Sequence, residues 1–577
     1  MARTAHTLDT NPQPELEPTL HDGDIPGTRI SGQHTVAAPG VAATTQKRIH
    51  KNVAVTIVVR LVYMVTRVGI TSYVFPRIGL TAWGIWSTAF LLVQYLGISN
   101  SGLSNVYIKY VAEFDARKEY SKANALLSTG LSFTIPFCAA LFAMIVVFWH
   151  FIERFVNLPV AYAHDGKEVF LIVFAVFLSS VSLQAFIDLM NGMQEIAVVQ
   201  WFTLVSYIVE IVLIYVFIRM GRGLRGLAEA YLARQAVYLA LCIAYDYYKF
   251  DWLHISPRLF SRRALRSVLH FGGVVQVQSF FAIVIAAPER ILGVRLLGMD
   301  AAGLFDLAKK WPSSTSTIPM SFFSAFLPAA SNLYQHTEGE ERTSAIRGLY
   351  LRGARQANIV AAYFCSIMAM LPLPIMVLWL GKKITEAPVA GIATGAMTPT
   401  QFHSAVLLFA LFNVAIQIHM LTGPGTSILR GIGRIYEEFW YAIPNVAFIG
   451  VAMAGVHILY HHWTVLNIGM AVSLATLFSA ALFLWRAHHV LQIGNAAYIR
   501  EVLWPGFVPY LVAAIFSIPV AHIVAHHGRI VGVGILLVTG FLYTILFAVV
   551  MDRLVLHENE RAQWRTLLQR RLTMLRS

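Results

Sequence analysis

The chain has 577 residues, of which 57% are hydrophobic and only 13% are charged, and its formal net charge is +14. Soluble proteins carry roughly 25% charged residues, so this composition excludes an ordinary soluble domain. Basic loops on the cytoplasmic side of a membrane and anionic lipid headgroups explain the positive charge without nucleic acid. The three cysteines have no paired spacing and fall in apolar segments, which is typical of small buried hydrophobic residues.

The first 50 residues are polar and rich in Pro, Gly, Thr and His, which predicts a disordered cytoplasmic tail without a cleavable signal peptide. From residue 51 to residue 552, apolar segments of membrane-spanning length follow one another. The sequence therefore predicts an all-α polytopic membrane protein. Hydropathy places about 14 spans at 53–75, 80–103, 124–150, 169–193, 199–220, 224–247, 268–297, 301–334, 354–380, 402–429, 439–460, 465–485, 502–524 and 530–551.

The distribution of lysine and arginine predicts the orientation. With the N-terminus in the cytoplasm, about 28 Lys and Arg fall inside and about 9 outside, as the positive-inside rule requires. An even number of spans leaves the C-terminus inside as well. Residues 553–577 are basic and amphipathic, which fits either a helix on the anionic inner leaflet or a solvated tail.

Two sequence echoes indicate an internal repeat. Gly-x4-Gly followed by an aliphatic and an aromatic residue begins at Gly79 and again at Gly298, six spans later. Gly192 and Gly431 are each followed nine positions on by tryptophan. A duplicated six-helix unit predicts two pseudo-symmetric lobes, with the substrate path between them. The expected domains are the tail 1–50, an N-lobe 51–250, a C-lobe 251–490, two extra helices in 491–552 and the basic tail 553–577.

The first span contains two arginines, Arg60 and Arg67, where unpaired charge is costly. Seven residues are almost two helical turns, so both side chains project from one face, about 10 Å apart along the axis. Arg60 is near enough to the span end to snorkel to the interface, whereas Arg67 is near mid-span. We expect both to face a water-filled cavity and to bind phosphate or carboxylate oxygens of an elongated anionic substrate.

The seventh and eighth spans add further charges, which serve either as structural pairs or as the lining and gate of the path. Asp306 and Lys310 have i,i+4 spacing, which predicts an ion pair, and Glu289 could pair with Arg60 or Arg67 across the cavity. The candidate substrate-binding residues here are Arg290, Arg295 and Lys310, and the candidate gating residues are Glu289 and Asp306.

Two carboxylates lie deep in other spans. Glu210 in the fifth and Asp188 in the fourth are candidates for coupling to protons or sodium, the alternative being an internal hydrogen-bonded role. The side chains of Gln184, Gln276, Gln278 and Gln417 fit either sugar hydroxyls or helix–helix hydrogen bonds. No metal or organic cofactor is expected. No Walker lysine motif or HExxH occurs in the sequence, and no acidic DxD cluster occurs between residues 51 and 552, which favours a transporter over an enzyme.

Several segments resemble one known family. They are Gly97–Glu113 with the hairpin Lys118–Asn124, then Glu289–Gly298 with Ala302–Ala308, and the pairs Ile318-Pro319 and Leu327-Pro328. The pattern, spread over roughly residues 50–550, is similar to bacterial polysaccharide and O-antigen flippases of the multidrug/oligosaccharidyl-lipid/polysaccharide exporter superfamily.

This resemblance implies a two-lobed, V-shaped bundle in the bacterial inner membrane that alternates between inward- and outward-facing states. The implied cargo is an undecaprenyl-diphosphate-linked oligosaccharide for lipopolysaccharide, O-antigen or exopolysaccharide synthesis. Other polysaccharide-assembly proteins are implied partners. Where relatives carry Asp in the seventh span, this chain has Glu289 followed by Arg290, which argues against simple proton coupling there.

Three alternatives stay open at this point. A multidrug or toxin exporter of the same fold would more typically show acidic residues in the N-lobe cavity and twelve spans. A membrane oligosaccharide polymerase or ligase would need a large outer loop, whereas the longest one expected here, 381–401, is short and rich in small residues. The third alternative is a non-transporting scaffold in an assembly complex.

Overall fold

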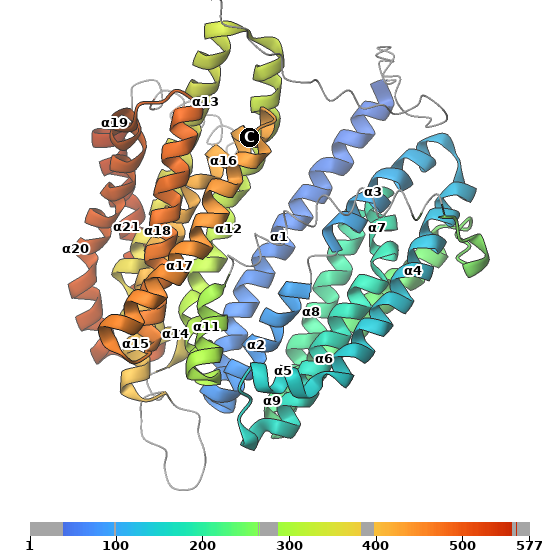
Figure 1. The fold of residues 1–577 in the computed structure, drawn as a ribbon, viewed down its shortest axis with the longest axis horizontal. Helices are drawn as coiled ribbons and strands as arrows, with labels where there is room; N and C mark the ends of the chain where they lie inside the picture. The colour runs from blue at the N-terminus through green and yellow to red at the C-terminus, as the bar shows by residue number, and fades with distance from the viewer. Residues whose placement is uncertain are drawn as a thin grey trace, which may run out of the picture. The chain divides into compact units, whose positions relative to one another are not determined.

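The structure is a computed structural model that describes residues 39–96, 100–262, 265, 287–381, 397–556 and 561. Within these ranges every regular element is helical (Figure 1), which confirms the all-α prediction. The elements are α1 Pro39–Ile78, α2 Leu80–Leu96, α3 Asn100–Arg117, α4 Tyr120–Val147, α5 Trp149–Phe155, η2 Val160–Tyr162, α6 Ala163–Ser182, α7 Gln184–Gly192, α8 Ile196–Arg219, α9 Gly223–Lys249, η3 Pro257–Leu259, α11 Pro288–Leu297, α12 Met299–His336, α13 Gly339–Met370, α14 Pro372–Leu380, α15 Pro399–Met420, α16 Thr422–Gly431, η5 Ile435–Glu438, α17 Phe439–Tyr460, α18 Val465–Val490, α19 Asn495–Tyr498, η6 Ile499–Leu503, α20 Trp504–His526, α21 Arg529–Val550 and η7 Met551–Val555.

The chain divides into Met1–Lys51 and a second compact unit, Asn52–Ser577. Helix α1 begins at Pro39, so the end of the segment that the composition predicts to be disordered is helical. The rest of that tail and all but Arg561 of residues 557–577 lie outside the described residues, as does most of the predicted seventh span.

The predicted spans agree largely with the helices. Among the described residues, nine helices are long and apolar enough to cross a membrane, and two bent helix pairs raise the number to 11. Each of these coincides with one of the predicted spans. The three other predictions fall on α2, which has 17 residues, on the largely undescribed seventh segment, and on α12. The first turns of α12 carry Asp300, Asp306, Lys309 and Lys310, which lower its hydropathy.

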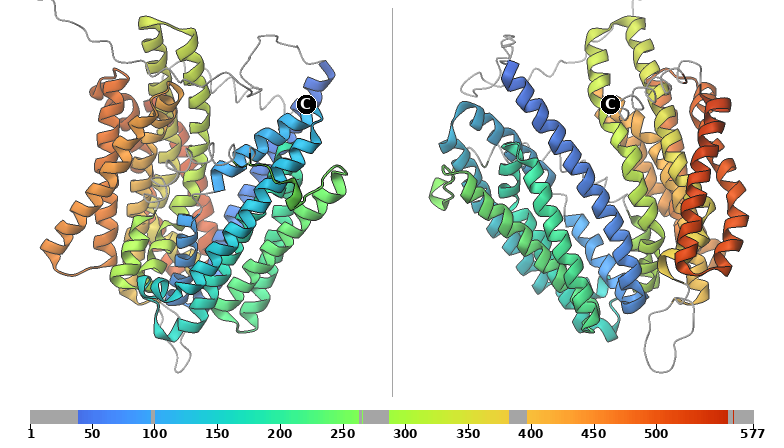
Figure 2. Two further views of the ribbon diagram at one scale, coloured as in Figure 1. Left: turned by 45° about the vertical axis from the view of Figure 1, so that its right-hand side comes forward. Right: turned by 180° about the vertical axis from the view of Figure 1, so that it is seen from behind.

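The helices pack mainly on neighbours from their own half of the sequence. In the first half α8 and α6 pack on α9, and α4 packs on α6. In the second half α12 packs on α13, α15 and α16, while α17 packs on α18 (Figures 1 and 2). The last two long helices, α20 and α21, pack on each other, and α20 packs on α13.

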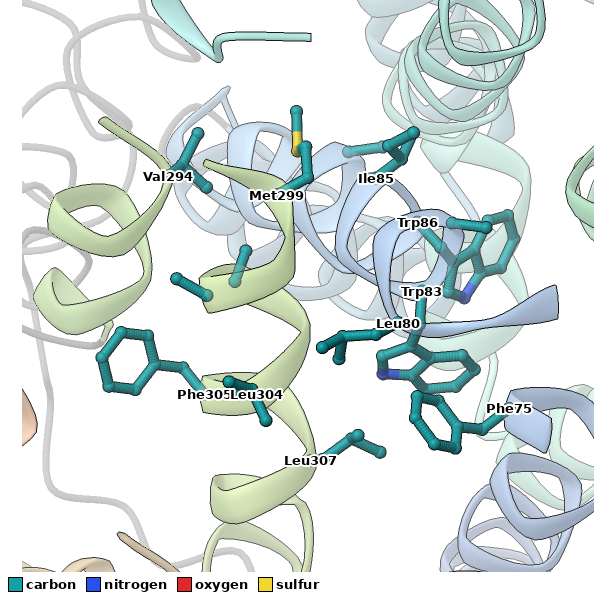
Figure 3. Close-up of a cluster of buried hydrophobic side chains, with 14 of the residues drawn as sticks. Phe75, Leu80, Trp83, Ile85, Trp86, Val294, Met299, Leu304, Phe305 and Leu307 are labelled. Atoms are coloured by element: carbon teal, nitrogen blue, oxygen red, sulfur yellow. The ribbon is translucent and has the colours of Figure 1, made fainter. Parts of the chain in front are cut away.

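Among the described residues, the most extensive contact between the two halves is that of α2 with α12. Figure 3 shows Leu80 and Leu307 between these helices, beside Trp83. The helices cross so closely that a Cβ on Gly84 would lie 1.9 Å from the carbonyl oxygen of Met299. Burial of these apolar side chains supplies the main driving force for the contact, and glycine at the crossing lets the backbones approach.

Hydrogen bonds between polar side chains also join α2 and α12. The Thr81 hydroxyl donates a hydrogen bond to Asp300 (2.7 Å). The indole N–H of Trp83 donates to Asp306 across 3.0 Å, and both side chains are buried. Because a buried polar group is costly when unpaired, these bonds fix the register of α2 on α12.

The two Gly-x4-Gly motifs therefore meet each other. Gly79 and Gly298 both adopt left-handed backbone conformations, with φ of 87° and 86°, which glycine allows without strain. A Cβ on Gly303 would lie 2.9 Å from the carbonyl oxygen of Leu80, mirroring the contact of Gly84 with Met299.

The glycines of the second echo, Gly192 and Gly431, are 239 residues apart, but the residues that they contact are 219 residues apart, as Gly79 and Gly298 are. The 219-residue separation of Thr81 and Asp300 also relates Ile108 to Leu327. A Cβ on Gly192 would lie 3.1 Å from the Ile108 carbonyl oxygen, and a Cβ on Gly431 would lie 2.6 Å from that of Leu327. Equivalent residues make equivalent close contacts, as expected of a duplicated unit.

Candidate functional site

The two arginines of α1 lie in different surroundings. Arg67 donates two hydrogen bonds to the carboxylate of Glu210 on α8, from Nη1 to Oε1 (2.9 Å) and from Nη2 to Oε2 (2.8 Å). The side chain of Glu210 is only 2% exposed and that of Arg67 is 24% exposed. This forked geometry is the strongest kind of guanidinium–carboxylate pair.

A second guanidinium approaches the same carboxylate. Nε of Arg234, on α9, lies 3.6 Å from Oε2 of Glu210, which is too long for a hydrogen bond. Nε is buried and has no hydrogen-bond partner among the described residues. Three helices thus bring two positive charges to one negative charge, and the cluster keeps unused donor capacity.

Arg60 lines a cavity of about 360 Å³ between α1, α7, α8 and α9. Its side chain is exposed, and no ion pair or hydrogen bond joins it to a described residue. An adjoining cavity of about 230 Å³ includes Arg234 in its wall. Arg60 therefore lies in the wall of a partly open cavity, and its contact with an anionic substrate stays a prediction.

The cavities have aromatic and amide walls. Tyr207 and Tyr238 line both of them, and Tyr63 lines the larger. The Arg67 guanidinium lies 5.1 Å from the ring centroid of Tyr63 and 5.8 Å from that of Tyr207. Cation–π attraction therefore holds the cation in place while its remaining donors stay available. Further polar lining comes from Gln184, Asn191, Gln200, Thr203, Ser206 and Gln235.

Asp188 lies on α7 and is fully buried. Its Oδ1 accepts hydrogen bonds from Ser104 (2.8 Å) and from Gln184 (3.0 Å). Its Oδ2 has no partner among the described residues. Gln184 therefore has a structural role and also contributes to a cavity wall.

A second charged cluster connects α11, α12 and α2. Glu289, which is fully buried, pairs with Lys309 (2.7 Å). Asp306 forms ion pairs with Arg290 (2.8 Å) and Lys310 (3.5 Å), and it accepts a hydrogen bond from Trp83. The predicted i,i+4 pair of Asp306 and Lys310 is thus present, and Arg290 completes it.

One expectation for this region is corrected. Glu289 pairs with Lys309 instead of with Arg60 or Arg67, because one turn of α11 and the facing turn of α12 already satisfy its charge. Arg295 lies apart from this cluster, and its role in substrate binding stays a prediction. Its side chain is exposed and donates to Asn157 across 3.3 Å, because it projects from the end of α11 toward the segment after α5.

Sequence reasoning missed two residues. Arg234 lies inside the sixth predicted span, so the rule that singled out Arg67 applies to it as well. Asp246 lies near the end of the same helix, is fully buried, and neither of its carboxylate oxygens has a partner among the described residues. Both are visible in the sequence as charges within an apolar span.

The other glutamines divide in two groups. Gln417 is a helix-packing residue, because it donates to Asn358 (3.1 Å) and accepts from Tyr510. Gln276 and Gln278 lie outside the described residues.

Comparison with known proteins places these features in a family context. Residues 49–334 match the family described as "Polysaccharide biosynthesis protein". The chain is similar to the uncharacterized membrane protein EpsK of Bacillus subtilis, with 19% identity over 498 residues, covering 86% of this chain and 93% of the relative. The resemblance inferred from the sequence is confirmed.

Solved structures show the same fold. An inward-facing multidrug resistance MATE family transporter of the MOP superfamily superposes with a TM-score of 0.61 at 12% identity, covering 75% of this chain and 98% of that one. The lipid II flippase MurJ, in an inward closed conformation, superposes with a TM-score of 0.59 at 11% identity, covering 87% and 98%. The chain has the fold of MOP-superfamily transporters.

Proposed function

We propose that this protein flips an undecaprenyl-diphosphate-linked oligosaccharide across the bacterial inner membrane for surface polysaccharide synthesis, by alternating access. The family match to polysaccharide biosynthesis proteins and the similarity to a lipid II flippase support a lipid-linked cargo. A multi-pass membrane location agrees with the apolar helices. Both termini are proposed to lie in the cytoplasm.

The observation that carries the proposal is the charge of the cavity region on α1, α8 and α9. Arg60 and Arg234 line the two cavities. Arg67 lies on the same helix as Arg60, and the carboxylate that faces Arg67 and Arg234 is that of Glu210. Charge inside a membrane is expensive, so an excess of one sign indicates a function. Guanidinium groups bind phosphate oxygens with forked geometry, and their charge lowers the cost of moving a diphosphate through a region of low dielectric constant.

The walls suit the sugar part of such a cargo. Tyr63, Tyr207 and Tyr238 offer flat apolar faces, while amides and hydroxyls offer hydrogen bonds. Binding sites combine apolar surface with a few placed polar groups in this way. We assign the polyprenyl chain to the lipid phase, because it is as apolar as the bilayer core.

The second cluster is proposed as a gate. Asp306 ties α2 of the first half to α11 and α12 of the second through Trp83, Arg290 and Lys310. Exchange of these partners would allow α2 and α12 to separate. Asp188 and Glu210 stay candidates for coupling to protons or sodium, and Arg290 and Lys310 for contact with the cargo when the gate opens.

Arg60→Ala tests the proposal most cleanly. The side chain is exposed and makes no ion pair with a described residue, so the change leaves packing intact. Loss of a charge-assisted contact to the cargo is expected to lower export about tenfold or more. The assay is surface polysaccharide in cells that lack the native gene, normalised to membrane abundance of the variant.

Arg219→Ala is the matched control, because Arg219 ends α8, bonds to Tyr215 and lines neither cavity. Export that is unchanged in Arg60→Ala and in the Arg60→Ala/Arg67→Ala double variant, at normal abundance, would remove these arginines from the mechanism. The same positive cavity disfavours export of a cationic drug, and drug resistance conferred by the wild-type gene would reverse that argument.

A further inference from the structure

Glu210 occupies the place at which a phosphate group would bind. Its two oxygens take the forked donors of Arg67 at 2.9 and 2.8 Å, and Arg234 lies 3.6 Å from one of them. A carboxylate and a phosphate present similar pairs of oxygens to a guanidinium group. An anionic cargo headgroup can use these arginines fully only if Glu210 releases them.

Release leaves Glu210 in unfavourable surroundings. Its side chain is 2% exposed, and a buried carboxylate that loses its cationic partner is strongly destabilised. The bound headgroup would also add negative charge nearby. A proton on Glu210 would remove both costs.

We propose that Glu210 is an internal counter-ion that the headgroup displaces from Arg67 and Arg234, and that binding is accompanied by uptake of one proton on Glu210. The inference rests on the proposed function, since it needs an anionic cargo at this site. The charges balance: two guanidinium groups and a neutral Glu210 match a diphosphate diester, which carries one negative charge on each phosphate.

The other groups around Glu210 do not replace it. On α1 it is faced by Arg67 and Tyr63, on its own helix by Tyr207, and on α9 by Arg234 and Tyr231. Helix α7, which also packs on α8, carries Asp188, whose partners are Ser104 and Gln184. Within the described structure Glu210 is thus the carboxylate that these two guanidinium groups share.

A pH dependence of binding follows. Because the complex holds one more proton than the free protein, affinity for the headgroup rises as pH falls, by up to about tenfold per pH unit. A glutamine at position 210 cannot take up the proton and holds the arginines less tightly. Binding to Glu210→Gln is therefore expected to be independent of pH and about tenfold tighter near neutral pH.

The experiment uses the full chain in detergent micelles and a short-chain prenyl-diphosphoryl sugar, whose charge is constant from neutral to mildly acidic pH. Isothermal titration calorimetry gives the affinity across this range. Titrations of the wild-type protein in buffers with different ionisation enthalpies give the number of protons taken up, so a folding defect in a variant does not affect that measurement. Glu229→Gln is the control, because Glu229 pairs with Arg222 outside the cavities.

Proton uptake by the wild-type protein, together with tight, pH-independent binding to Glu210→Gln, supports the exchange. Zero proton uptake, or a wild-type affinity and pH slope in Glu210→Gln, overturns it. The variant Arg67→Ala separates this result from failure of the proposed function. If Arg67→Ala binds the probe as the wild-type protein does, the anion site itself is wrong, and the exchange falls with it.

Discussion

Replacing Gly84 by alanine tests whether the close crossing of α2 and α12 stabilises the fold. The new Cβ would lie 1.9 Å from the carbonyl oxygen of Met299, whereas ordinary van der Waals contact begins at 3.4 Å. Both obstructing atoms nearest to it are backbone, so no side chain can rotate away. The two helices must separate by about 1.5 Å, the difference between these distances.

That separation would break the polar contacts across the crossing. Adding about 1.5 Å to the Thr81–Asp300 distance of 2.7 Å or the Trp83–Asp306 distance of 3.0 Å exceeds hydrogen-bond range. Overpacking costs about 1–3 kcal/mol and each lost bond about 1 kcal/mol. We expect the free energy of unfolding to fall by about 3–5 kcal/mol.

Gly450→Ala is the reference variant, because a Cβ there meets nothing within 4 Å and it reports the gain in helix propensity alone, about 1 kcal/mol. Gly303→Ala should fall between the two, since its Cβ would lie 2.9 Å from the nearest atoms. The assay is denaturant unfolding in micelles, followed by tryptophan fluorescence. If Gly84→Ala unfolds within about 0.5 kcal/mol of Gly450→Ala, the crossing is not the tight contact described above.

Three further outcomes are expected in the same unfolding assay. Asp306→Asn should lower the free energy of unfolding by about 3–5 kcal/mol, because two cations lose their buried counter-charge. Arg295→Gln, at an exposed hydrogen bond, should change it by less than about 0.5 kcal/mol. Equal losses in the two variants would contradict this assignment. Asp246→Asn should leave stability unchanged or raise it, since no described residue donates to that carboxylate and burying an unpaired charge is costly; a large loss would show that it has a partner. The double variant Arg67→Ala/Glu210→Ala should be more stable than Arg67→Ala alone, because the single change leaves Glu210 buried without its main partner. A double variant that is less stable than Arg67→Ala would refute the pairing.

The sequence determined the class of protein and predicted an internal repeat. Apolar segments of about 20 residues predict membrane helices because the thickness of the bilayer fixes their length, and 11 of the predicted spans coincide with candidate spans. The motif at Gly79 and Gly298 predicts a duplication because both copies need the same turn and the same small residue. The cost of charge in lipid also predicts that Arg60 and Arg67 avoid a lipid-facing position.

Only the tertiary structure decided which charges meet. Which charged residues pair depends on how the helices pack, and the sequence does not show which residues far apart in the chain will meet. Glu210 is shared by Arg67 and Arg234, which come from two other helices. Glu289 pairs with Lys309 instead of with an arginine of α1. Helical periodicity predicts which face of its helix Arg295 lies on, but only the packing of the helices shows that this face is exposed. The sequence therefore set the inventory of buried charge, and the geometry of helix contacts set its pairing.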